Sequence, residues 1–191
     1  MTASCPRRSR TMEFMSRLAS MAAMIGGLIW AAAVVATALR PSGVPAAFRP
    51  TVDLYPTELV SFILMAIATK ALAASLARDR LAWAAVILVW LGAAVFSVNV
   101  AFVITTGTDR DVWVTDYIGK FLVFFGSGVF GVALLRRGLV PVGVAILMLV
   151  TAVMSPVTND QDARVLLWLP LGLGWVAVGV ATLRGVKMGV R

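Results

Sequence analysis

The charged residues whose spacing could support chemistry in this chain form three pairs, each with an acid followed by an arginine. The pairs, with separations of 20, 20 and 22 residues, are Glu58/Arg78, Asp116/Arg136 and Asp162/Arg184. On a helix such a separation spans about 30 Å, the hydrocarbon thickness of a bilayer. The three acids could therefore form a ring of carboxylates at one membrane face. The interpretation that we favour is a structural role, because acids are favourable at the positive N-terminal end of a helix and cations at the C-terminal end.

Lys70 is interpreted as the one charge inside an apolar stretch. It lies 12 residues after Glu58 and 8 before Arg78, which places it about 12 Å from the arginine end of its helix. One interpretation is that it extends its alkyl stem toward lipid headgroups. The alternative is that it faces the helix bundle and binds an anionic group, in which case Ala66 and Ala74 on the same helix stripe should be buried with it.

Two other residues inside apolar stretches are candidates for a functional role. Asn99 could offer a polar contact to Lys70 or to a solute. Pro170 cannot donate a backbone hydrogen bond and should kink the last helix seven residues after its start. Thr57 and Thr115, which directly precede Glu58 and Asp116, are candidate N-caps of the helices that carry those two acids.

Several kinds of chemistry are excluded by composition. The sequence contains no histidine, which removes the usual general base and the commonest transition-metal ligand, and its single cysteine is Cys5. The run Phe125-Gly126-Ser127-Gly128 places a serine between glycines, but nothing is present to activate it, so we interpret it as a helix-packing point. The acids avoid the centres of the apolar stretches, where proton-driven transporters place a carboxylate. We therefore expect no enzyme activity, cofactor or metal.

These residues must be positioned by membrane-spanning helices. Of 191 residues, 60% are apolar and 14% charged, far from the balance of soluble proteins. Six stretches have spanning length: 18–39, 57–77, 81–105, 117–135, 139–157 and 163–183. Basic residues are concentrated in alternate gaps and in the tails 1–17 and 184–191, so we expect both termini in the cytoplasm, with the protein in a bacterial plasma membrane.

The fold class that follows is an all-α, polytopic six-helix bundle with short loops. The second and third stretches resemble the fourth and fifth when the sequence is shifted by 58 residues, which indicates a possible internal hairpin repeat. The pairs related by this shift include Asp53/Asp111, Thr57/Thr115, Glu58/Asp116 and Arg78/Arg136. Small residues at four-residue spacing predict close helix contacts, namely Ala19/Ala23/Gly27/Ala31 and Ser127/Gly131.

Three functions are compatible with these observations. The first is a non-enzymatic accessory or scaffold subunit of a membrane assembly, with the lipid bilayer, other subunits or a second copy as partners. The second is a small permease or channel for an apolar or anionic solute, lined by Lys70, Asn99 and Pro170. The third is a membrane enzyme acting on lipid. The net charge of +8 is explained by the basic loops, so we expect no nucleic-acid partner.

Overall fold

The computed structural model describes residues 6–39, 54–76, 79–107, 113–157 and 163–187. Within these ranges the chain is helical and contains no strand. The α-helices are α1 (Pro6–Ala38), α2 (Tyr55–Ser75), α3 (Arg80–Thr106), α4 (Trp113–Arg136), α5 (Val142–Met154) and α6 (Leu169–Lys187). Two 3-10 helices, η3 (Ser155–Val157) and η4 (Ala163–Trp168), lie between α5 and α6.

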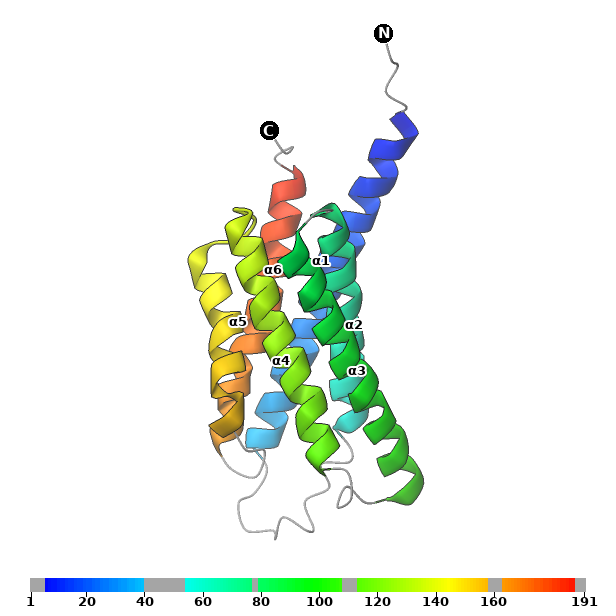
Figure 1. Ribbon diagram of the computed structural model, residues 1–191, viewed down its shortest axis with the longest axis vertical. Coiled ribbons are helices and arrows are strands. Elements are labelled where there is room, and N and C mark those ends of the chain that lie inside the picture. Colours follow the sequence, from blue (N-terminus) through cyan, green and yellow to red (C-terminus); the bar gives the residue numbers. More distant parts are fainter. Residues whose placement is uncertain (1–5, 40–53, 77–78, 108–112, 158–162, 188–191) are drawn as a thin grey trace.

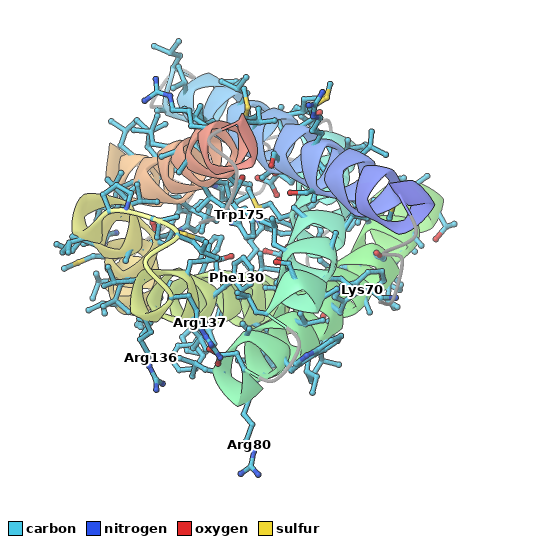
Figure 2. The ribbon with its side chains drawn as sticks, turned by 90° about the horizontal axis from the view of Figure 1, so that it is seen from above. Lys70, Arg80, Phe130, Arg136, Arg137 and Trp175 are labelled. Atoms are coloured by element: carbon cyan, nitrogen blue, oxygen red, sulfur yellow. The ribbon has the colours of Figure 1, made fainter. Side chains whose placement is uncertain are left out.

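The six α-helices form a closed ring. Each packs against the next in the chain, and α6 returns to pack against α1 (Figures 1 and 2). Successive helices run in opposite directions, so α1 begins and α6 ends at the same end of the bundle. We call this the basic end, because the α2–α3 and α4–α5 turns lie there with Arg80, Arg136 and Arg137. The opposite end is called the acidic end, because α2 and α4 begin there and carry Glu58 and Asp116 in their first turns.

Five helices of the described chain are long and apolar enough to cross a membrane. The predicted fifth span is shorter: α5 begins at Val142 after the N-cap Pro141, and with η3 the apolar helix covers Val142–Val157. Proline favours the helix start because it has no N–H to donate. The all-helical prediction is therefore confirmed, and five of the predicted spans are present as helices of suitable length and composition to cross a membrane.

The last span differs from the prediction at Pro170. We expected one helix with a kink, whereas the chain forms the 3-10 helix η4 and then begins α6 at Leu169. Pro170 is thus the second residue of α6. A backbone N–H at this position would have no acceptor within the helix, so a proline there removes no intrahelical hydrogen bond. It marks the start of the α-helix rather than a bend inside one.

Helix caps also differ from the expectation for the two threonines. The helix α2 begins at Tyr55 with Leu54 at the N-cap, so Thr57 lies inside it. Thr115 lies in the first turn of α4. A side-chain cap is found instead at α3, where Asp79 accepts hydrogen bonds from the backbone N–H groups of Leu81 and Ala82. This places a short acidic side chain where the first N–H groups of α3 need an acceptor.

Small residues bring neighbouring helices into close contact, as the stripes predicted. A Cβ on Gly27 would lie 2.5 Å from the Gly172 carbonyl oxygen, and one on Gly172 would lie 2.6 Å from the Gly27 oxygen, so α1 and α6 touch backbone to backbone. Gly92 and Gly119 make a similar crossing between α3 and α4. Glycines at these positions allow an approach that any other side chain would prevent.

Aromatic rings fill the interior between the helices. Trp30 of α1 packs against Phe62, Phe124 and Trp168, with ring centroids 5.0, 5.4 and 6.0 Å apart. Trp30 also donates its indole N–H to the Trp168 carbonyl oxygen at 3.0 Å. Nearer the basic end, Phe130 and Trp175 stack in the middle of the ring (Figure 2).

Candidate functional site

A buried ionic cluster lies at the acidic end of the bundle. The Lys120 ammonium is 3.1 Å from Glu58 Oε2 and 3.3 Å from Asp116 Oδ2. The three side chains are exposed by only 5%, 10% and 14%, respectively. We call these residues the lysine cluster. Charges so well removed from water are stable only when they are paired.

The local sequence explains how the cluster forms. Asp116 and Lys120 are four residues apart on α4, so their side chains meet on one helix face. Glu58 lies in the first turn of α2 and Asp116 in the first turn of α4, where the helix dipole favours a negative charge. The two carboxylates that the 58-residue shift relates thus converge on one ammonium.

Three aromatic rings surround the same ammonium. The Lys120 Nζ lies 5.2 Å from the ring centroid of Tyr55, 5.4 Å from that of Phe96 and 5.4 Å from that of Trp168. The negative faces of aromatic rings attract a cation at such distances. Because the rings come from α2, α3 and η4, Lys120 connects α4 to three other elements.

Lys120 was not among the residues predicted from the sequence. It lies inside the predicted span 117–135, so the statement that Lys70 is the one charge within a span is wrong. A position near the helix start made Lys120 resemble a loop residue. The four-residue spacing to Asp116, together with a second acid at the equivalent position of α2, is the signal that could have identified it.

Asn99 of α3 lies at the same acidic end of the bundle and contacts α4. Its side chain is buried, and its Oδ1 accepts a hydrogen bond from the Thr115 hydroxyl at 2.8 Å. Among the described residues its Nδ2 has no hydrogen-bond partner. Asn99 follows Phe96 by one helical turn, so it lies beside the lysine cluster and at the opposite end from Lys70.

The side chain of Lys70 lies on the outer surface of the bundle. Its side chain is exposed, and the ammonium is 5.5 Å from the ring centroid of Trp90, which is itself exposed. Of the two alanines expected to be buried with an inward-facing lysine, Ala66 is buried but Ala74 is exposed. Its polar neighbour Thr69 donates to its own helix, at the Met65 carbonyl oxygen. The geometry therefore agrees with a lysine that extends along the outer surface of the helices rather than into their interior.

The remaining candidates do not extend the site. Asp162 lies outside the described residues, and Pro170 is half-buried at the start of α6. Ser127 is buried and accepts a hydrogen bond from the Trp175 indole at 3.1 Å, which agrees with a packing role. Among the residues that the structure describes, no group of three or more acids and cysteines could hold a metal ion.

A second ion pair connects the two turns at the basic end. Arg137 Nε donates to Asp79 Oδ2 at 2.9 Å. This hydrogen bond, together with the N–H groups of Ala82 and Leu81 and the charge of Arg137, lowers the pKa of the Asp79 carboxyl below its usual value near 3.8, although burial of the carboxyl opposes the shift. The α2–α3 turn is thereby attached to the α4–α5 turn.

No protein-family model, curated protein or solved structure matches this chain. The arrangement itself therefore has to indicate what the site can do. In the lysine cluster the Lys120 ammonium lies between two carboxylates and three aromatic rings. These contacts fix the acidic ends of α2, α4 and η4 relative to one another.

Proposed function

We propose that this chain is a six-span protein of the plasma membrane, with both termini in the cytoplasm, that acts as a non-enzymatic accessory or scaffold subunit. The observation that carries the proposal is the filled interior. Packed aromatic rings from α1, α2, α3, α4 and η4 occupy the middle of the ring, where a permease would need a path. A bundle stabilised in this way is suited to present a fixed outer surface to neighbouring proteins and lipids.

The outer surface supports the same proposal. Large apolar side chains are exposed on every α-helix, as a bilayer requires. The short fifth span is α5 with η3, 16 residues and about 24 Å long, which a bilayer can accommodate by local thinning. The arginines at the basic end support a cytoplasmic location for that end, because basic loops are retained there.

The test is affinity purification from native membranes in a mild detergent, followed by quantitative mass spectrometry of the eluate. A scaffold subunit should retain a partner in stoichiometric amount, and untagged membranes provide the control. Recovery of the chain alone, with thermal stability that rises when a solute is added, would contradict the proposal.

The second candidate is a permease, and the lysine cluster is the observation that favours it. A buried ammonium between two carboxylates is a place where a charged solute could exchange partners. Proteoliposomes loaded with candidate anions or amines would test this. Uptake that is lost in Lys120→Met and kept in Lys70→Met would support transport through the cluster.

A further inference from the structure

Three arginines gather where the two turns of the basic end meet. Arg80 is the first residue of α3 and Arg136 the last of α4, with Arg137 next in the chain. The Asp79–Arg137 hydrogen bond joins these segments, and each of the other two arginines is one residue away, about 3.8 Å along the backbone. Figure 2 shows all three on the same side of the bundle. We call Arg80, Arg136 and Arg137 the arginine patch.

Most guanidinium N–H groups of the arginine patch are available to bind a ligand. Arg80 and Arg136 are exposed and make no ion pair with any described residue, and Figure 2 shows both side chains directed away from the helices. Arg137 uses its Nε, which leaves the terminal nitrogens of a half-exposed guanidinium available. Asp79 is already engaged by Arg137 and by two backbone N–H groups. Guanidinium groups bind phosphate oxygens through paired hydrogen bonds.

Apolar surface begins directly beside the patch. On α3 the side chains of Trp83 and Ile87 are exposed, and after α4 those of Leu139 and Val142 are exposed. A phosphate bound by the arginines would therefore be continuous with a surface suited to acyl chains. Free phosphate or nucleic acid would make no use of that surface, whereas a phospholipid would use both parts.

We propose that the arginine patch binds the headgroup phosphate of an anionic phospholipid, with the acyl chains lying along α3 and α5. Cationic side chains near the membrane surface attract anionic lipid, and three arginines on one side of the bundle, two of them next in sequence to the Asp79–Arg137 pair, would concentrate that general attraction. This inference rests on the proposed membrane location, and it is independent of whether the protein acts as a scaffold or a permease.

The experiment measures thermal unfolding of the purified full chain in mixed micelles. Phosphatidylglycerol is compared with phosphatidylcholine of the same acyl chains at equal concentration. With lipid at about 100 times its Kd, we expect the Tm in phosphatidylglycerol to exceed that in phosphatidylcholine by about 5–10 °C. Inorganic phosphate at the same phosphorus concentration should give no such rise.

The variants separate the patch from general electrostatics. Arg80→Gln combined with Arg136→Gln leaves the Asp79–Arg137 bond in place and should reduce the difference between the two lipids to less than about a third. Arg184→Gln removes an exposed arginine from α6 and should keep the difference. The Tm in phosphatidylcholine reports whether each variant folds; if the double variant does not fold, Arg136→Gln alone should lose about half of the difference.

Three outcomes would overturn the site. They are equal Tm values in both lipids for the unchanged protein, an undiminished difference in the arginine variants, and an equal loss in Arg184→Gln. Stabilisation by inorganic phosphate alone would also overturn it, because the patch would then bind an anion without a lipid. Retention in membranes after alkaline extraction tests membrane location separately, so that location can hold even if the lipid site fails.

Discussion

At the level of single residues, the charge of Lys120 connects α4 to α2, α3 and η4. Replacing it with methionine keeps a similar side-chain length but removes the cation that Glu58 and Asp116 both contact. Removing one partner of a buried ion pair destabilises by about 3–5 kcal/mol. We therefore expect Lys120→Met to lower the unfolding free energy by that amount, measured by denaturant titration in detergent.

The matched control is Lys70→Met. Its ammonium lies over the exposed ring of Trp90, an arrangement worth about 0.5–1 kcal/mol. A loss in Lys70→Met as large as that in Lys120→Met would contradict the assignment of Lys120 as the buried charge and Lys70 as the peripheral one.

Asp79 has two roles that substitutions can separate. Asp79→Asn keeps a side-chain acceptor at the N-cap of α3 but removes the charge paired with Arg137, whereas Asp79→Ala removes both. We expect both variants to be less stable than the unchanged protein at pH 7, and Asp79→Ala to be the less stable of the two. The measurement is the Tm of the three proteins in the same detergent.

The pH dependence of Asp79 follows from its lowered pKa. A carboxyl whose pKa is lower in the folded state stabilises the fold above its unfolded pKa, and this contribution is lost as the pH falls through the folded value. The stability difference between the unchanged protein and Asp79→Asn should therefore be constant from about pH 5 to 7 and shrink below about pH 4. A difference that grows on acidification would contradict the ion pair.

At the scale of helices, the α1–α6 crossing depends on two glycines. A Cβ at Gly172 would meet the Gly27 carbonyl oxygen at 2.6 Å and the Ala31 backbone nitrogen at 3.0 Å, and neither backbone atom can move freely. We expect Gly172→Ala to separate the helices and cost about 1–3 kcal/mol, measured by denaturant unfolding. Gly143→Ala on α5 meets nothing within 4 Å and should be neutral or stabilising. Equal effects would show that the crossing is not tightly packed.

The hairpin repeat stays a prediction. Of the positions that should coincide, Asp53, Asp111 and Arg78 lie outside the described residues, while Glu58 and Asp116 approach the same ammonium. An experimental structure should allow α2 to be overlaid on α4 with these two acids aligned, although α5 is 13 residues long and α3 is 27. A best overlay shifted by a helical turn or more would reject the duplication.

At the scale of the whole molecule, the ring has an even number of helices, so α1 begins where α6 ends. Topology reporters fused after Arg80, Gly138 and Arg191 should report the cytoplasm, because arginines are retained there. Fusions after Arg49, Arg110 and Asn159 should report the opposite side. One consistent reversal would place the basic end outside and would remove the support for a cytoplasmic location.

Local sequence patterns were sufficient to predict the helical class, the alternation of basic and acidic ends and the small-residue contacts. These features follow from local rules: apolar length, charge placement and four-residue spacing are all readable along the chain. The glycine contact between α1 and α6 is a case in which the type of residue was predictable although its partner, Gly172, was not.

Which charges are buried depends instead on how the helices pack against one another in three dimensions. Lys70 and Lys120 both lie in apolar stretches, yet one faces outward and the other is enclosed by residues of α2, α3 and η4. Burial depends on which side of a helix meets its neighbours, and the helices here are apolar on all sides, so the pattern of hydrophobicity does not mark the inner face. Apart from Asp116, the partners of Lys120 come from 24 to 65 residues away in the chain, and only the closure of the ring brings them together.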